Sequence, residues 1–294
     1  MRLSAFAPAK VNLFLHVGGP DAEGYHPISS LMVFADVGDE VSVQASEAPS
    51  FETTGQFGAG IPAGDDNLVM RAARAFHAGA AAPLPPFRLL LDKRLPIAAG
   101  LGGGSSDAGA ALRLLRDALA PGLSDEALEA MASSLGADGA ACLWGQPVMA
   151  EGRGERLSPA PGLPPLNAVL VNPLAPSPTG AVYRAYDAAV AAEGEARPWM
   201  PEAFESAEEV AAWLVAATRN DLEAPAVALE PLIGEVLDIL RDEPEALMAR
   251  MSGSGATCFA LCASDIEAEG LAERLESMRP DWWVRRCRLD RGLD

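Results

Sequence analysis

The sequence predicts an α+β fold built from two lobes, and three observations support this prediction. The chain has 294 residues, close to the size at which a single hydrophobic core stops growing. Strand-like and helix-like segments are mixed along it. A stretch near the middle, residues 157–183, contains seven prolines and is predicted to be a linker, because proline interrupts helices. We therefore expect an N-terminal lobe of residues 1–157 and a C-terminal lobe of residues 158–294.

The N-terminal half begins with strands and continues into helices. Strands are expected where apolar and β-branched residues alternate with other residues or form a short run, in residues 3–17, 28–43 and 87–91. Helices are expected where apolar residues recur at helical spacing, in residues 67–78, 105–119 and 124–135. Asp66 or Asn67 is expected to cap the first helix, and Ser105 or Ser106 to open the second. Gly136 is expected to end the third.

The C-terminal half has the same mixture of elements. Strands are expected at residues 168–171, 246–251, 257–262 and 283–289. Helical patterns occupy residues 181–192, 206–218, 231–240 and 265–278. The alternation predicts an α+β lobe of the split βαβ type.

The charge balance excludes several classes of partner. Lys and Arg total 22 and Asp and Glu total 41, so the formal net charge is −19. Such an acidic surface repels nucleic acid and anionic membranes. The four cysteines include no CxxC pair, which argues against a zinc site or a disulfide scaffold. Pro8 and Lys10 interrupt the apolar N-terminal run, which argues against a signal peptide. We expect a cytoplasmic protein that binds neither nucleic acid nor membrane, in which any anionic ligand is held by a local site.

A glycine-rich segment is the strongest candidate for that local site. Residues 95–107 have the sequence LPIAAGLGGGSSD and lie between an expected strand and an expected helix. The glycines let the backbone approach a ligand closely, and the helix start offers free N–H groups that bind phosphate. A Walker loop requires a lysine after its glycines, and this segment has none. A dinucleotide fingerprint requires a glycine at the position that Ser105 occupies. A phosphate loop of another type is indicated, and a glycine-rich turn without a ligand is the alternative.

Isolated polar residues add weaker signals. Only two of the 22 basic residues are lysines, and Lys10 lies in an apolar strand, where it is either a solvated lysine or an ammonium group directed into a cleft. Asp138 is either an ordinary turn residue or a carboxylate that accepts a hydroxyl proton. The adjacent Tyr25 and His26 suit stacking and hydrogen bonding to a flat base, or are plain surface residues. Gly253 lies in a second glycine-rich turn, which alone is consistent with a hairpin.

Four motifs taken together resemble a known superfamily. The sequence contains PAKVNLFL at residues 8–15 with GYH at 24–26, the glycine-rich segment at 95–107, LGAD at 135–138 and MSGSGAT at 251–257. Their order and spacing are similar to those of the galactokinase, homoserine kinase, mevalonate kinase and phosphomevalonate kinase superfamily across nearly the whole chain. The first motif followed by GYH resembles the branch that phosphorylates a cytidine diphosphate-linked methylerythritol in the non-mevalonate pathway to isoprenoids.

This resemblance implies a two-lobed small-molecule kinase with its active site in the cleft between the lobes. It implies ATP as phosphoryl donor, with Mg²⁺ bridging the phosphates and no metal ligand assigned, and a monomer or homodimer. By the same resemblance Asp138 is the catalytic base and Lys10 orients it. The nucleotide is expected to contact Asn67, Pro96, Gly100, Leu101, Gly102, Gly103, Gly104, Ser105 and Ser106. The acceptor, whose 2-hydroxyl is phosphorylated, is expected to contact Asn12, Tyr25, His26, Thr179, Tyr183 and Gly253.

The sequence also departs from the pattern of this branch. Gly139 and Ala140 follow Asp138 where Val-Pro is usual, which predicts a less rigid catalytic loop, and Tyr183 replaces a common Phe but keeps an aromatic face. Two rival functions stay open. One is a kinase of the same superfamily that acts on homoserine, mevalonate or a sugar, for which Tyr25 and His26 have no role. The other is a nucleotide-binding protein without catalytic activity, against which the presence of both Lys10 and Asp138 speaks.

Overall fold

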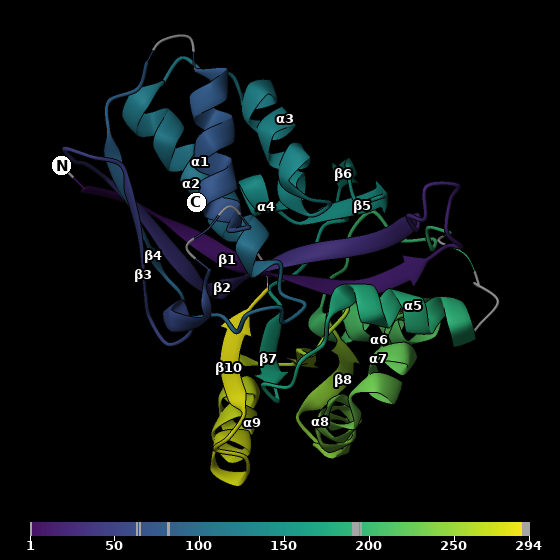
Figure 1. The fold of residues 1–294 in the computed structure, drawn as a ribbon. Helices are drawn as coiled ribbons and strands as arrows, with labels where there is room; N and C mark the ends of the chain where they lie inside the picture. The colour runs from purple at the N-terminus through teal and green to yellow at the C-terminus, as the bar shows by residue number, and fades with distance from the viewer. Residues whose placement is uncertain are drawn as a thin grey trace.

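Two antiparallel-rich sheets and their helices form the molecule. The computed structural model describes residues 2–62, 64, 66–80, 83–189, 194 and 196–289. In Figure 1 the long strands β1 and β2 run across the centre, with α1 to α4 on one side of them and β7 to β10 with their helices on the other. The structure thus confirms the predicted α+β fold and its division between an N-terminal and a C-terminal half.

The first sheet belongs to the N-terminal half. Its order is β3-β4-β2-β5-β6, with β1 paired to β2. The strands are β1 (Arg2–Val17), β2 (Ile28–Ala45), β3 (Ser50–Thr54), β4 (Phe87–Asp92), β5 (Val148–Gly152) and β6 (Arg156–Pro159). All pairs are antiparallel except β3 with β4. The short strands β3, β5 and β6 were not expected from the sequence.

Four helices and a short 3₁₀ turn complete this half. They are η1 (Gly58–Gly60), α1 (Leu68–Gly79), α2 (Gly103–Leu119), α3 (Asp125–Leu135) and α4 (Gly139–Trp144). Asn67 caps α1, since its side-chain oxygen accepts from the N–H groups of Val69 and Met70. The expectation that Ser105 or Ser106 opens α2 is wrong. The helix begins at Gly103, after Gly102 in the left-handed conformation at φ 61°, because glycine adopts that conformation without strain.

The second sheet has the predicted split βαβ topology. Its strands are β7 (Asn167–Asn172), β8 (Ala246–Met251), β9 (Cys258–Cys262) and β10 (Trp283–Arg288), and its order is β10-β7-β9-β8. The helices of this half are α5 (Thr179–Ala189), α6 (Ala207–Ala217), α7 (Glu223–Leu229), α8 (Pro231–Asp242) and α9 (Asp265–Met278). Residues 190–192 of the expected helix 181–192 lie outside the described residues. Each strand pair of this sheet is antiparallel, as this topology requires.

The prediction that residues 157–183 form a linker is wrong for most of that stretch. Strand β6 ends inside it, α5 begins inside it, and β7 forms an inner strand of the second sheet. Six of the seven prolines lie in the segments that flank β7, where they do not interrupt backbone pairing, and Pro159 is the last residue of β6. The last strand of the first sheet ends at Pro159 and the first strand of the second begins at Asn167.

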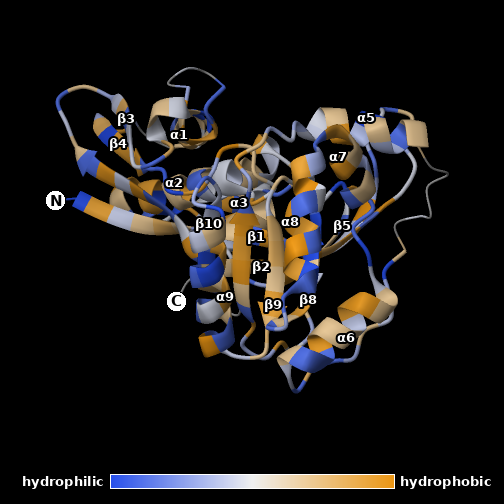
Figure 2. Cartoon of the chain, turned by 90° about the horizontal axis from the view of Figure 1, so that it is seen from below, coloured by the Kyte–Doolittle hydropathy of each residue, from blue (hydrophilic) through white to orange (hydrophobic). Residues whose placement is uncertain are grey.

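Strands β1 and β2 provide the hydrophobic residues that join the two halves. Val11 and Leu13 of β1 belong to the same buried cluster as Leu170 and Phe259 of the second sheet. In the hydropathy view the central strands are largely apolar, whereas α8 and α9 show mixed faces (Figure 2). Burial of apolar surface at about 25 cal/mol per Å² is the main stabilising term of such a junction. The relative placement of the halves therefore depends on this shared core.

The pairing of β1 with β2 is irregular at two places that bracket the polar residues of β1. The register shifts between Pro8 and Lys10 and again between Asn12 and Phe14. Lys10 and Asn12 are separated by two positions and therefore lie on one face of the strand. Both are buried, with 4% and 3% exposure. Bulges of this kind redirect side chains, and here they flank the strand segment that carries both polar groups.

A buried ion cluster attaches the glycine-rich segment to the first sheet. The Lys93 ammonium contacts a carboxylate oxygen of Asp39 at 2.5 Å and one of Asp107 at 2.7 Å. The other Asp39 oxygen accepts from the N–H groups of Arg94 and Leu95. Burial, opposed by the Lys93 charge, raises the pKa of Asp107 to about 8. The cluster thus ties β2, the end of β4 and the first turns of α2 together.

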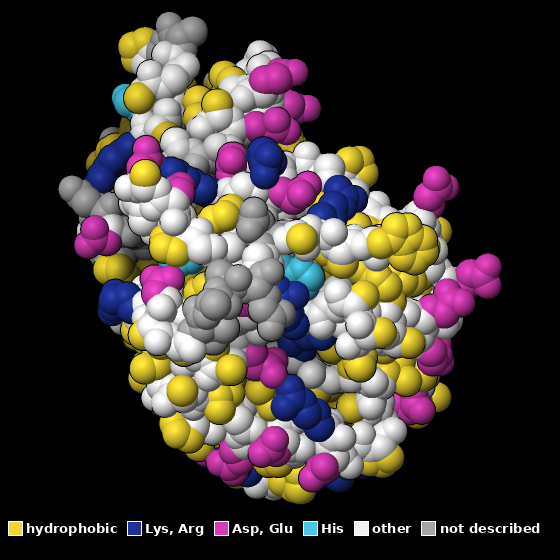
Figure 3. Space-filling model, turned by 90° about the vertical axis from the view of Figure 1, so that its right-hand side faces the viewer, with side chains coloured by type: hydrophobic (Ala, Val, Ile, Leu, Met, Phe, Trp, Pro, Cys, Tyr) yellow, Lys and Arg dark blue, Asp and Glu magenta, His cyan; other side chains and the backbone are white. Residues whose placement is uncertain are grey.

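The outer surface matches the acidic composition. Figure 3 shows one face, on which acidic side chains are scattered among basic and hydrophobic ones. None of the described helices is both long and apolar enough to cross a membrane.

Replacing Lys93 by Met is expected to lower the free energy of unfolding by about 3–5 kcal/mol, because it leaves buried carboxylates without their cation. Urea unfolding followed by circular dichroism measures this loss. The matched control is Arg88→Met, which removes a cation from the exposed pair with Glu52 and should change stability little. Equal losses in the two variants would show that burial of the cluster is not the cause.

His16, near the end of β1, gives the stability a pH dependence. Its Nδ1 lies 2.9 Å from the Ala196 carbonyl and its Nε2 accepts from the Arg219 N–H at 3.3 Å, an arrangement that requires the neutral ring. Burial, reinforced by the charges of Arg219 and Arg250, lowers the pKa of His16 below 6.5.

The unfolded chain consequently takes up this proton at a higher pH than the folded protein does. Acidification from about pH 7 to about pH 5 should therefore reduce stability, whereas the His16 contribution is constant above that range. His16→Gln should lose this part of the pH dependence. Urea titrations of both proteins across the range test it, and parallel stability curves would contradict it.

Candidate active site

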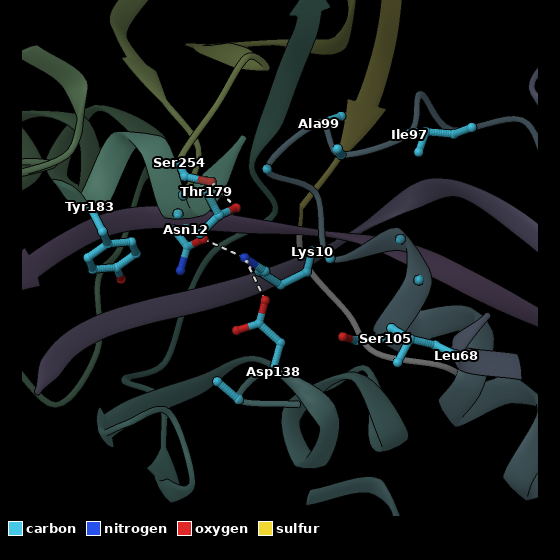
Figure 4. Close-up of a pocket in the computed structure, with 18 of the residues that line it drawn as sticks. Lys10, Asn12, Leu68, Ile97, Ala99, Ser105, Asp138, Thr179, Tyr183 and Ser254 are labelled. Carbon is cyan, nitrogen blue, oxygen red and sulfur yellow. Dashed lines mark hydrogen bonds and ion pairs between the residues drawn. The ribbon is translucent and has the colours of Figure 1, made fainter. Parts of the chain in front are cut away.

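A cavity of about 840 Å³ lies between the two halves, a volume typical of small-molecule sites. Its wall combines residues of β1, the glycine-rich segment, the loop before α4, α5 and the turn between β8 and β9. Figure 4 shows Lys10 and Asp138 in the middle of this wall, with Tyr183 on one side and Ser105 and Leu68 on the other. All the predicted site residues except Leu101 and Ser106 thereby line one cavity, although they come from distant parts of the chain.

Lys10 is the centre of the polar arrangement. Its ammonium nitrogen lies 2.5 Å from the Asn12 side-chain oxygen and 3.2 Å from a carboxylate oxygen of Asp138 (Figure 4). The Asn12 amide nitrogen in turn donates to the Ser30 hydroxyl at 2.7 Å. Two acceptors thus hold a nearly buried cation, and the Asp138 side chain keeps 29% exposure toward the cavity.

Asp138 is placed by the short helix α4, which it precedes as N-cap. A Cβ atom at Gly139 would lie 1.9 Å from the Ala132 carbonyl oxygen, so only glycine permits this close packing of α4 on α3. This contact gives a physical reason for the glycine after Asp138. The expected lower rigidity of the catalytic loop stays a prediction.

The glycine-rich segment presents backbone to the cavity. Six of its predicted residues line the wall: Pro96, Gly100, Gly102, Gly103, Gly104 and Ser105. The first N–H groups of α2 have no partners within the helix and can bind an anion. Leu101 and Ser106 are buried, with 1% and 0% exposure, and are not among the residues that line the cavity. The structure therefore places these two behind the loop.

The glycine-rich segment is joined to the turn between β8 and β9 by several hydrogen bonds. The Ser252 hydroxyl accepts from the Asn12 N–H at 3.1 Å and donates to the Gly100 carbonyl at 3.0 Å. The Thr257 N–H donates to the Ala99 carbonyl at 3.1 Å. A Cβ atom at Gly100, whose φ is 75°, would lie 2.3 Å from the Ser252 carbonyl oxygen. The close approach of the two segments thus requires glycine at this position.

Gly253 lines the cavity as predicted, and a residue that the sequence did not single out holds it. The Asn220 amide nitrogen donates to the carbonyls of Met251 and Gly253, both at 2.8 Å. Its side-chain oxygen accepts from the Leu222 N–H. No local pattern marks Asn220, since its partners follow 31 and 33 residues later in the chain.

One end of the cavity is formed by the start of α1. Asn67 and Leu68 line it together with Ile61, Pro62 and Ile97. The Asn67 side chain is engaged in capping α1 and in donating to the Pro62 carbonyl at 3.1 Å. Its expected contact with adenosine stays a prediction. The apolar neighbours suit a flat nucleobase.

The opposite end is aromatic. His26 Nε2 lies 2.7 Å from an Asp187 carboxylate oxygen, and the His26 and Tyr183 ring centroids are 4.9 Å apart. Burial and the Asp138 charge raise the pKa of Tyr183 to about 12, so this phenol is neutral. Tyr25 is 56% exposed and lies under the Arg153 guanidinium at 4.1 Å from the ring centroid. All three rings line the cavity, with His26 against Tyr183 and Tyr25 against Arg153, and their contact with cytosine stays a prediction.

Two further residues near this end were missed from the sequence. Asp187 stands four positions after Tyr183 on α5, a helical spacing that could have indicated it. Ser254 contacts the Thr179 hydroxyl at 2.8 Å, and no sequence pattern relates residues that are 75 positions apart. The arrangement as a whole offers an anion-binding helix start, a lysine-carboxylate pair and a flat aromatic pocket, in that order along one cavity.

Comparisons with known proteins agree with this geometry. The family model described as GHMP kinases N terminal domain matches residues 67–146, and the one described as GHMP kinases C terminal matches residues 200–281. A crystal structure of homoserine kinase from Cytophaga hutchinsonii superposes with a TM-score of 0.69 at 17% identity, covering 99% of this chain and 95% of that one. This likeness shows the shared fold.

Closer relatives carry a more specific name. The 4-diphosphocytidyl-2-C-methyl-D-erythritol kinase of Caulobacter vibrioides (strain NA1000 / CB15N) is 78% identical over 289 residues, covering 98% of this chain and 100% of the relative. That of Hyphomonas neptunium is 48% identical, covering 98% and 96%. A crystal structure of 4-(cytidine 5'-diphospho)-2C-methyl-D-erythritol kinase has a TM-score of 0.77 at 34% identity, covering 99% of this chain and 100% of that chain. The chain therefore belongs to the GHMP kinases, in the family of the 4-diphosphocytidyl-2-C-methyl-D-erythritol kinases.

Proposed function

We propose that this protein transfers the γ-phosphoryl group of ATP to the 2-hydroxyl of 4-diphosphocytidyl-2-C-methyl-D-erythritol. One observation carries the proposal: the Lys10–Asp138 pair lies between a helix start suited to phosphates and a pocket suited to a pyrimidine. The names of relatives that share 78% of the sequence point to the same acceptor. The protein then acts in the non-mevalonate route to isoprenoids.

In this mechanism the chain mainly aligns the reactants and neutralises charge, which is what a loose phosphoryl-transfer transition state requires. The backbone N–H groups from Gly102 to Ser105 hold the phosphates of the donor. Asp138 accepts the proton of the acceptor hydroxyl as its oxygen attacks the phosphorus. Lys10, 3.2 Å from Asp138, orients this carboxylate and polarises the hydroxyl, while Asn12 holds Lys10 in place.

The site also suits a magnesium ion that is carried by the nucleotide. No group of three or more His, Cys, Asp or Glu side chains in the described part of the chain forms a metal cage. Mg²⁺ commonly needs none, because it binds through substrate phosphates, water and one or two protein oxygens. The Ser105 hydroxyl on the cavity wall would hold it. When bound, the ion shields the negative charge of the phosphates.

The two lobes meet near residues 157–158, and the protein acts in the cytoplasm as a monomer or homodimer.

The sharpest test of the function is release of ADP in a coupled assay with a panel of acceptors. The diphosphocytidyl methylerythritol should support turnover, whereas homoserine, mevalonate and galactose should not. Turnover with one of the latter would favour a different kinase of the superfamily, and absence of turnover with all four would favour a nucleotide-binding protein without activity.

Replacing Asp138 by Ala should reduce kcat by about 10²–10⁴-fold, because the hydroxyl proton loses its acceptor. Steady-state kinetics measure this effect. Affinity for a non-hydrolysable ATP analogue should stay unchanged and serves as the control for folding. Near-normal turnover with intact nucleotide affinity would remove Asp138 from the role of base.

Replacing Tyr25 by Ala should raise the KM for the acceptor far more than the KM for ATP, since a stacking contact with a base contributes about 1–3 kcal/mol. Tyr25→Phe keeps the ring and is the matched control. Equal changes in both KM values, or an equally impaired Phe variant, would contradict stacking on this ring.

A further inference from the structure

Four lysine or arginine side chains line the cavity in the described part of the chain, and they differ in how they are paired. Three are held by carboxylates: Lys10 by Asp138, Lys93 by Asp39 and Asp107, and Arg153 by Asp21 and Glu23. The fourth, Arg184, has no ion pair, hydrogen bond or ring contact with the described residues. It is therefore the cation of this wall whose charge is left for a ligand.

The position of Arg184 on α5 directs it along the cavity. It follows Tyr183 directly and shares a helix face with Gly180 and Asp187, which also line the cavity. Its Nη1 atom lies 3.4 Å from where a Cβ of Gly180 would be. The guanidinium thus folds back toward the N-terminal end of the helix, as long helical side chains do. It lies along the wall between Tyr183 and the start of α5.

The acceptor must cross this part of the wall. Under the proposed function, its cytosine occupies the aromatic end beside Tyr183 and its hydroxyl lies at Asp138. A diphosphate joins the two parts and so passes along the same face of α5. Thr179, at the start of α5, contacts Ser254 of the turn that approaches Lys10 (Figure 4). The diphosphate is the only part of the acceptor with permanent negative charge, and a chain of net charge −19 repels it unless a local cation binds it.

We infer that Arg184 binds the diphosphate of the acceptor and makes the protein select a cytidine diphosphate over an uncharged cytidine. A guanidinium matches phosphate oxygens with two parallel N–H donors. The unpaired state of Arg184 means that binding breaks no existing ion pair. Arg184 is then a specificity-determining residue, distinct from the stacking rings and from the Lys10–Asp138 pair. The inference rests on the proposed function.

The test compares CDP with cytidine as probes of the acceptor site. Calorimetric titrations of the full chain are made with the nucleotide site saturated by a non-hydrolysable ATP analogue, so that CDP cannot bind there. In Arg184→Ala the affinity for CDP should fall by roughly 10- to 100-fold, the effect of losing a hydrogen-bonded charge pair. The affinity for cytidine should not change, and Arg184→Lys should lie between wild type and Ala.

Arg286→Ala is the matched control, because it removes the same charge from an exposed side chain of β10 that is not among the residues lining the cavity. It should leave the affinity for CDP unchanged. An unchanged CDP affinity in Arg184→Ala, or equal losses for CDP and cytidine, would overturn the role of Arg184 while leaving the proposed function in place. Failure of wild type to bind either probe would overturn the proposed function itself, and this inference with it.

Discussion

The hydroxyl group of Ser252 hydrogen-bonds to two other segments of the site at the point where the three segments meet. It accepts from the backbone of β1 and donates to the backbone of the glycine-rich segment, while belonging to the turn after β8. Together with the backbone bonds from Lys10 to Leu101 at 2.7 Å and from Thr257 to Ala99 at 3.1 Å, this side chain holds the three segments at a fixed spacing. Asn220 fixes the other side of that turn. The spacing at the centre of the cavity depends on these bonds as well as on the shared core, because the three segments come from both halves of the molecule.

The electrostatic design follows from the acidic composition. The acidic surface does not attract phosphate, so the positive charge that binds a phosphate comes from a few groups that point into the cavity. Peptide N–H groups at the start of α2 carry partial charge without adding a side chain. The buried Lys93 cluster holds that helix start in place and is itself neutralised by Asp39 and Asp107. The anions that enter are thus recognised by direction and spacing, and an excess of positive side chains is unnecessary.

The sequence predicted the parts of the site that lie in short motifs. Lys10 with Asn12, the glycines from 100 to 104 and the Tyr25–His26 pair could be predicted because residue type and local spacing already limit their chemistry. The helix start at Gly103 could not be predicted with the same ease, since the serines two and three positions later also suit a cap. The left-handed conformation of Gly102 places the helix start at Gly103.

Other features were hidden because they depend on contacts between distant segments. A strand was expected at residues 168–171, but the prolines before and after it favoured a linker for the surrounding stretch, so the place of β7 inside the second sheet was not predicted. Its inner position comes from pairing with six residues of β10 on one side and five residues of β9 on the other. Asn220 and Ser252 have ordinary local surroundings. That Arg184 has no ion-pair partner among the described residues becomes visible only when the partners of the other three cations are known.

The two register shifts in β1 impose a constraint of a different kind. Side chains of a strand alternate between faces. The register of the segment from Lys10 to Asn12, between the two bulges, therefore determines which of its side chains face the cavity. Exchanging a residue there alters one contact, but inserting or deleting one would turn the polar pair into the hydrophobic interior and an apolar neighbour into the cavity. Natural variation along this strand should consequently consist of substitutions, with changes in length confined to the hairpin that follows Val17.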